Sequence, residues 1–133
     1  MNAVRRMFGL AAVAAVFAVA GVLQASAMTP TPYSAEAFKA AQASGSPILV
    51  EIHADWCPTC KAQVPILDKL TADPKFKDLK VFRVDFDAMK PAVKQFRAQM
   101  QSTLIVFKGG TEKGRSVGDT AQASIAALLD KSL

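Results

Sequence analysis

Cysteine is scarce in this chain, which has only Cys57 and Cys60 among its 133 residues. Secreted miniproteins held together by disulfides carry more cysteines and space them further apart. A bond between Cys57 and Cys60 would close a very short loop, and disulfides across short loops stabilise the folded state least. A purely structural disulfide is therefore a poor explanation of this pair.

Histidine is scarcer still, because His53 is the only one. Structural zinc normally takes four protein ligands, and one histidine with two cysteines does not complete such a site within a monomer. The sequence therefore predicts no metal site, and we interpret His53 as a packing residue. The less favoured alternatives are that His53 tunes Cys57 or joins the two sulfurs around a metal ion.

A basic stripe is also lacking, although 16 Lys and Arg residues outnumber 11 Asp and Glu residues. The lysines are scattered among acidic residues without interleaved aromatic side chains, so nucleic acid is not expected as a partner. The length allows one domain, and there is no internal repeat or long linker.

Charge is absent from Phe8 to Leu23, a run of apolar and small residues that is short for a membrane span. Arg5 and Arg6 precede the run, and the small residues Ala25-Ser26-Ala27 follow it. This order predicts a signal peptide over residues 1–27 and a mature domain over 28–133 in the periplasm. An uncleaved membrane anchor is the alternative. The arginine pair also resembles part of a twin-arginine signal, but Val4 stands where a small polar residue is usual, so general secretion is favoured.

Residues 28–133 alternate between patterns typical of helices and of strands. Helices are predicted at 35–43 (capped by Ser34), 56–71 (containing Pro65), 88–98 (capped by Asp87) and from Asp119 or Thr120 onward, and strands at 48–53, 79–85, 103–107 and 113–117, with a turn at Gly109-Gly110. Three residues of the second helix, Val64, Leu67 and Leu70, are expected to face the core. The order predicts an α/β fold, with a mixed central β-sheet flanked by helices on both faces.

The segment from Trp56 to Lys61, with the sequence Trp-Cys-Pro-Thr-Cys-Lys, lies where a buried strand passes into a helix. The free amides and the positive end of a helix N-terminus favour a thiolate over a thiol. Cys57 comes just before the first turn and is expected to attack disulfides. Cys60 lies about one turn further in and is expected to resolve the mixed disulfide.

Several segments together resemble the thioredoxin family over residues 34–133. They are the motif 56–61, Pro65 in the helix that follows it, the stretch 102–110 and Val117-Gly118. The resemblance implies a thioredoxin fold and a thiol–disulfide oxidoreductase whose redox-active disulfide is Cys57–Cys60. It further resembles the exported branch that serves cytochrome c maturation and periplasmic thiol reduction. This implies a monomer without a cofactor that acts on disulfide-containing protein substrates and draws electrons from a membrane thiol donor.

The family's buried acid corresponds to Glu51, in the apolar strand that leads to the motif. Burial penalises the charged form of a carboxyl group, so the pKa of Glu51 is expected to be raised. Such a group can exchange a proton with Cys60, and Glu51 is therefore assigned a catalytic role as the proton-exchange partner of Cys60. The alternative is a residue at the end of a strand with its carboxylate in solvent.

The resemblance also implies a substrate-binding surface formed by Trp56, Gln101, Ser102 and Thr103. Ser102 stands where the family carries a cis-proline. A cis bond before a residue other than proline costs about 2.5–4 kcal/mol, so the Gln101–Ser102 bond is expected to be trans. Pro58-Thr59 replaces the family's common Gly-Pro between the cysteines and adds no cation beside Cys57.

Four functions are compatible with this pattern. A dithiol reductant is favoured, and a dithiol oxidase or isomerase is the alternative within the same chemistry. Copper(I) binding by Cys57 and Cys60 is an alternative of another class, since thiolates are soft ligands. A redox-inactive adaptor is disfavoured by the intact pair of cysteines.

N-terminal sequencing of the exported protein is expected to identify Met28 as the first residue. The reason is the order of the arginine pair, apolar run and Ala25-Ser26-Ala27 in residues 1–27. A protein that stays in the membrane fraction and begins at Met1 would contradict the predicted cleavage.

Overall fold

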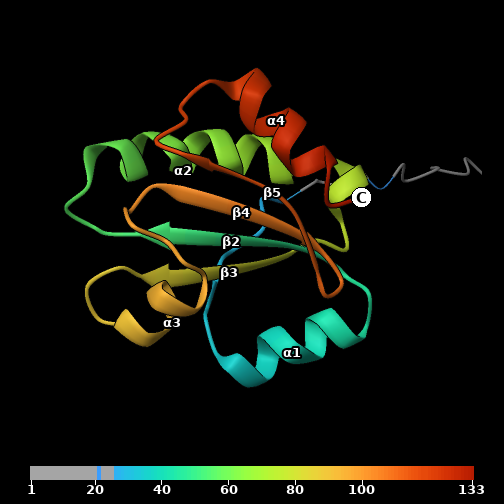
Figure 1. Ribbon diagram of the computed structural model, residues 1–133. Coiled ribbons are helices and arrows are strands. Elements are labelled where there is room, and N and C mark those ends of the chain that lie inside the picture. The colour runs from blue at the N-terminus through green and yellow to red at the C-terminus, as the bar shows by residue number, and fades with distance from the viewer. Residues whose placement is uncertain (1–20, 22–25) are drawn as a thin grey trace, which may run out of the picture.

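A computed structural model of the chain describes residue 21 and residues 26–133 (Figure 1). The elements are β1 (Thr31–Pro32), α1 (Ala35–Ala43), β2 (Pro47–His53), α2 (Pro58–Thr71), the 3-10 helix η1 (Pro74–Phe76), β3 (Lys80–Asp85), α3 (Lys90–Gln95), β4 (Thr103–Lys108), β5 (Thr111–Val117) and α4 (Gln122–Asp130). The signal peptide predicted over residues 1–27 lies outside the described residues, apart from Gly21, Ser26 and Ala27. Within the described part, no helix has the length and apolar character needed to cross a membrane.

The five strands form one mixed sheet in the order β1-β3-β2-β4-β5. Strand β3 is parallel to both β1 and β2, whereas β4 is antiparallel to β2 and to β5. Strand β2 is therefore hydrogen-bonded along both edges and is buried over most of its length. Its nearly continuous apolar sequence is typical of such a central strand, and the predicted mixed sheet is confirmed.

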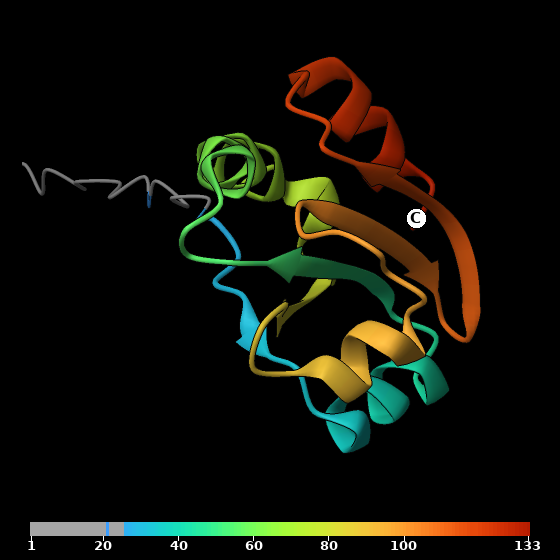
Figure 2. The same cartoon turned by 60° about the vertical axis from the view of Figure 1, so that its left-hand side comes forward.

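Helices α2 and α4 cover one face of the sheet, and α1 and α3 cover the other (Figures 1 and 2). Alternate residues of β2 point to opposite faces. Ile48, Val50 and Ile52 join the core beneath α1 and α3, whereas Leu49 joins the core beneath α2 and α4. Glu51 shares the face of Leu49, so the only acidic residue of β2 points toward the helix that carries the cysteines.

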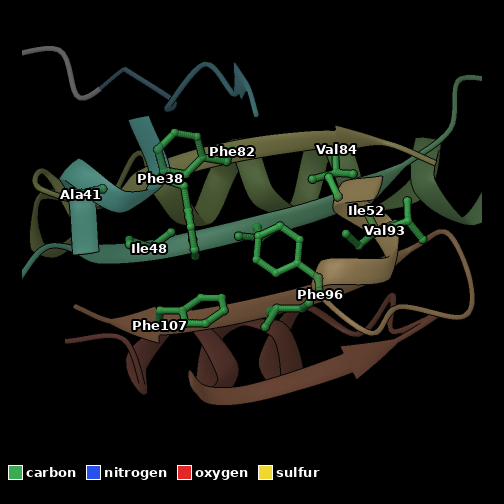
Figure 3. Close-up of a cluster of buried hydrophobic side chains, with 12 residues drawn as sticks. Phe38, Ala41, Ile48, Ile52, Phe82, Val84, Val93, Phe96 and Phe107 are labelled. Atoms are coloured by element: carbon green, nitrogen blue, oxygen red, sulfur yellow. The ribbon is translucent and has the colours of Figure 1, made fainter. Parts of the chain in front are cut away.

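The core beneath α1 and α3 is rich in phenylalanine (Figure 3). Phe38 is the centre of this group, and its ring meets those of Phe82, Phe96 and Phe107 edge-on, with centroids 5.9, 5.2 and 5.3 Å away. Edge-to-face pairs of this kind stabilise a fold beyond the area they bury. These contacts connect α1 to the sheet and to the end of α3.

Helix α1 begins as the sequence predicts, because the Ser34 hydroxyl accepts a hydrogen bond from the amide of Ala37. Helix α2 begins at Pro58 and not at Trp56. Cys57 is its N-cap, and the Cys57 sulfur accepts a hydrogen bond from the amide of Cys60.

Two predicted N-caps are wrong. Helix α3 is shorter than residues 88–98, and Asp87 does not cap it. Instead the carboxylate of Asp85 accepts hydrogen bonds from the amides of Asp87 and Ala88, and a positive φ of 52° at Arg97 follows the helix. Helix α4 has Ala121 as its N-cap, and Asp119 accepts a hydrogen bond from the Ala121 amide.

The inward row of α2 also differs from the prediction. Leu67 is buried and Leu70 is partly buried against the core, as expected, but Val64 is only half-buried and does not join the core. The buried position in that turn belongs to Gln63, a polar residue. Residues 63, 67 and 70 follow helical spacing as well as 64, 67 and 70 do, so apolar periodicity alone selected the wrong neighbour.

Candidate active site

Cys57 and Cys60 lie at the junction between β2 and α2, and both are free thiols in this structure. The Cys57 amide donates to the carbonyl of Ala54 at 3.1 Å, which closes the turn before the helix. The amide of Cys60 then donates to the Cys57 sulfur at 3.1 Å. This places the sulfur of Cys57 at the helix N-terminus, where free amides and the helix dipole favour negative charge.

The two thiols differ in acidity. Burial by itself raises the pKa of Cys57, but hydrogen bonds from the Cys60 thiol, the amides of Cys60 and Thr59 and the side chain of Gln101 outweigh it, so this pKa lies below its ordinary value. For Cys60, burial and the neighbouring Cys57 raise the pKa to about 11. Cys57 is therefore the better nucleophile at neutral pH, since the thiolate is the reactive form.

Glu51 is buried on β2 and pairs with an arginine on the neighbouring strand. The two residues are register partners in the parallel β2–β3 ladder, and Arg83 reaches the Glu51 carboxylate at 2.8 Å and 2.9 Å. Burial raises the pKa of Glu51, and the charge and hydrogen bond of Arg83 only partly oppose that rise. This direction agrees with the one expected from the sequence.

Arg83 was missed in the sequence analysis, although a signal existed. It interrupts an otherwise apolar run in β3, much as Glu51 interrupts the run in β2. A buried charge is costly unless it is paired, so two opposite charges in two adjacent buried strands are candidates for one ion pair. Recognising the pair requires the register between β2 and β3, because that register alone places the two residues side by side.

His53 lies at the end of β2 and borders a hollow of about 360 Å³ that is also lined by Asp55, Arg83 and Asp85. Its Nε2 atom lies 3.2 Å from the carboxylate of Asp55, which is otherwise almost fully exposed. Burial, followed by the charge of Arg83, lowers the pKa of His53. Among the residues that the structure describes, no group of three or more His, Cys, Asp or Glu side chains is placed to hold a metal ion.

Trp56, the residue before the first cysteine, is 59% exposed. Its indole nitrogen donates a hydrogen bond of 2.6 Å to Asp87 on the loop after β3. This bond orients a large apolar surface beside the motif.

Two further residues assigned to substrate binding, Gln101 and Ser102, lie near the cysteines. The Gln101 side chain acts to lower the pKa of the Cys57 thiol, and the backbone of Ser102 acts to lower that of Cys60. Thr103 is buried, and its hydroxyl donates to the carbonyl of Met100. The structure therefore brings Gln101 and Ser102 to the sulfurs but turns the Thr103 hydroxyl inward.

The bond between Gln101 and Ser102 is trans, as expected, because the described residues contain no cis peptide. The sequence did not reveal that Ser102 has a φ of 57°, in the left-handed region that residues other than glycine rarely occupy. Ser102 is buried, and its hydroxyl donates to the carbonyl of Gln101. A strained buried residue beside two reactive groups is a feature that occurs at functional sites.

Known proteins with a similar sequence share this site-bearing domain. A family model described as thioredoxin matches residues 29–131. A thioredoxin of Chlamydia trachomatis is 35% identical over 98 residues, covering 74% of this chain and 93% of that protein. A thioredoxin of Pseudomonas aeruginosa is 32% identical over 87 residues, covering 65% and 80%. The crystal structure of Trxlp from Edwardsiella tarda is 48% identical with a TM-score of 0.74, covering 76% of this chain and 98% of that one.

The buried Glu51 is expected to make stability depend on pH. Its folded pKa is raised above the ordinary 4.5, so the folded chain retains a proton that the unfolded chain releases. This contribution is fully present below pH 4.5 and is lost as the pH rises through the folded pKa, at about 1.4 kcal/mol per pH unit within that window. Urea unfolding of the reduced protein between pH 4 and 8 measures it.

Glu51→Gln should remove that loss of unfolding free energy, whereas Glu36→Gln, a change at an exposed position of α1, should keep the wild-type profile. If the profiles of Glu51→Gln and wild type ran parallel over this range, the raised pKa of Glu51 would be contradicted.

Proposed function

The chain belongs to the thioredoxin family, and from this we propose that it is a periplasmic dithiol reductant that reduces disulfides in protein substrates. Its fold is the thioredoxin fold, and it is an enzyme of thiol–disulfide exchange. The observation that carries the proposed exchange reaction is the contrast between the two thiols, with the pKa of Cys57 lowered and that of Cys60 raised to about 11.

The reaction proceeds in two exchanges. The Cys57 thiolate attacks one sulfur of a substrate disulfide, so that a mixed disulfide forms and the other substrate sulfur leaves as a thiolate, which takes up a proton. Cys60 then loses its proton and attacks the Cys57 sulfur, which releases the second substrate thiol. Two electrons pass from the dithiol to the substrate, and the enzyme is left with a Cys57–Cys60 disulfide.

Cys60 needs a base for the second exchange, because its pKa of about 11 keeps it protonated at neutral pH. We assign this role to Glu51, which shares the α2 face of the sheet and has a raised pKa. A carboxyl group whose pKa lies closer to the working pH is better suited to pass a proton in both directions. Arg83 keeps the carboxylate form of Glu51 available, since its charge and hydrogen bond oppose the effect of burial.

Substrate is proposed to bind along Trp56 and the loop of Gln101, Ser102 and Thr103. Trp56 supplies exposed apolar surface that Asp87 holds in place. The carbonyl of Gln101 already accepts a hydrogen bond from the Ser102 hydroxyl. It is therefore less available to accept a hydrogen bond from the backbone of a substrate. The Gln101 side chain instead lies at the thiol that the substrate disulfide must reach.

The surroundings of Cys57 support the proposed direction of electron flow. A helix N-terminus stabilises its thiolate, but neither Pro58 nor Thr59 adds a cation. Strong oxidants have a very acidic thiol that stabilises the dithiol form, and Cys57 lacks that extra help. In an oxidising compartment such a protein needs electrons from a membrane thiol donor. Thiol reduction during cytochrome c maturation is a fitting task, and the protein is proposed to act as a monomer.

Substitution of single cysteines should separate their roles. Cys60→Ser is expected to accumulate mixed disulfides between Cys57 and substrate, because the resolving thiol is missing. Cys57→Ser should trap little, since burial still raises the pKa of the Cys60 thiol when Cys57 is gone, and Cys60 is almost inaccessible. Non-reducing electrophoresis of periplasmic extracts after acid quenching compares the two variants, and equal trapping by both would contradict the assignment.

The reduction potential decides between reductant and oxidant. We expect roughly −200 to −270 mV for the Cys57–Cys60 couple, between glutaredoxin-like and thioredoxin-like values. Equilibration against a series of glutathione redox buffers, followed by alkylation and mass spectrometry, measures it. A value near −120 mV would identify a dithiol oxidant in place of the proposed reductant.

A further inference from the structure

Helix α2 buries one amide side chain on its inner face, that of Gln63, which is 4% exposed. An amide removed from water is costly unless its hydrogen bonds are replaced. The Nε2 atom of Gln63 makes two hydrogen bonds in place of those to water. It donates to the carbonyl of Ser102 at 3.2 Å and to the carbonyl of Asp119 at 2.9 Å. Both amide hydrogens are therefore used on backbone acceptors from distant parts of the chain.

The two carbonyls flank the β4–β5 hairpin. Ser102 immediately precedes β4, and Asp119 lies two residues beyond the end of β5. The amide of Gly118 also donates to the Ser102 carbonyl, at 2.9 Å, so both ends of the hairpin meet at this one oxygen. Gln63 lies three residues after Cys60 and connects the cysteine helix to that meeting point.

Ser102 needs such support because its backbone is strained. A residue other than glycine keeps a φ of 57° only where several surrounding contacts hold it in that conformation. The carbonyl of Ser102 is held by Gln63 and by Gly118, and its hydroxyl turns back to the carbonyl of Gln101. These contacts together specify the left-handed turn.

This turn places two groups near the sulfurs. The Gln101 side chain acts to lower the pKa of the Cys57 thiol, and the backbone of Ser102 acts to lower that of Cys60. A change at Gln63 would thus reach the reactive thiol through Ser102 and Gln101.

We propose that Gln63 is a positioning residue for the thiol–disulfide exchange, which holds the 101–102 loop against Cys57 and Cys60 by clamping the carbonyls of Ser102 and Asp119. The proposal rests on the proposed function in one respect, that Cys57 is the attacking thiol. Gln63 itself does not touch the substrate or the reacting sulfurs. It maintains the contact between Gln101 and Cys57 that favours the thiolate.

Two substitutions test the clamp. Gln63→Met keeps the length and volume of the side chain but has no donor. Gln63→Asn keeps the amide but is one methylene too short to reach both carbonyls. The matched control is Thr71→Val, which removes the polar group of another buried residue on α2, whose hydroxyl accepts a hydrogen bond from the amide of Met28. Thermal unfolding followed by circular dichroism establishes that each variant is folded.

The readout is the Cys57 thiol itself, titrated by thiolate absorbance at 240 nm and alkylated by iodoacetamide at pH 7. Gln63→Met and Gln63→Asn are expected to move the thiolate midpoint upward by about half a pH unit, which slows alkylation at this pH by up to about threefold. Thr71→Val should leave both quantities at wild-type values even if it lowers the unfolding temperature. These measurements need no substrate and no direction of electron flow, so their outcome is independent of the reduction potential.

A double-mutant cycle tests the route. Gln101→Leu removes the group that contacts Cys57, and adding Gln63→Met to it should change alkylation no further, because both changes interrupt one series of contacts. Folded Gln63 variants with wild-type titration and alkylation would overturn the proposal. Additive effects of the two substitutions would overturn it as well, since Gln63 would then act independently of Gln101.

Discussion

The hydrogen bonding of β2 along both of its edges is the constraint on which the site depends. Its parallel partner β3 brings Arg83 beside Glu51. Its antiparallel partner β4 begins where β2 ends, with Ile52 opposite Thr103. The cysteines follow the end of β2, and the loop of Gln101 and Ser102 precedes the start of β4. Three segments that are distant in sequence therefore meet around the C-terminal end of β2, the central strand.

At the end of β2, two cysteines that are about equally inaccessible differ in acidity. Both are almost inaccessible, at 2% for Cys57 and 1% for Cys60. Cys57 receives backbone amides and the Gln101 side chain, and these outweigh the cost of burying its charge. Cys60 lacks enough such compensation and stays protonated beside its more acidic neighbour. The deeper position of Cys60 and the larger supply of hydrogen bonds to Cys57 together separate the resolving from the attacking thiol.

Local sequence signals predicted much of this arrangement, and contacts across the sheet account for the remainder. The Ser34 cap, the apolar run of β2 and the strand-to-helix position of the cysteines depend on neighbouring residues, and the structure agrees with them. Arg83 could not be paired with Glu51 without the register of two strands. The Asp87 cap was wrong because Asp85 accepts the amides of this turn and α3 begins only at Lys90, while Asp87 accepts the distant indole of Trp56.

Ser102 shows the same limit in backbone conformation. The sequence correctly predicted a trans bond, because only local energetics were involved. It contained no sign of a left-handed residue, since serine has no preference for that region. The conformation is specified from outside the loop, by Gln63 and Gly118 acting on the Ser102 carbonyl. Gln63 was overlooked because a polar side chain is expected to be exposed unless buried hydrogen-bond acceptors are known for it. Its acceptors, the carbonyls of Ser102 and Asp119, lie far away in the sequence.

The left-handed turn at Ser102 also restricts how this domain can diverge. Proline has φ locked near −65° and cannot adopt the 57° found here, so replacing Ser102 by proline requires the loop to rearrange. The Ser102 carbonyl would then leave Gln63, whose buried amide would lose a partner at a cost of about 1–3 kcal/mol. An apolar residue at 63 would likewise leave the present loop without its support. Because the Gln63 amide and the Ser102 carbonyl share one hydrogen bond, the effect of a substitution at either position is expected to depend on the residue at the other.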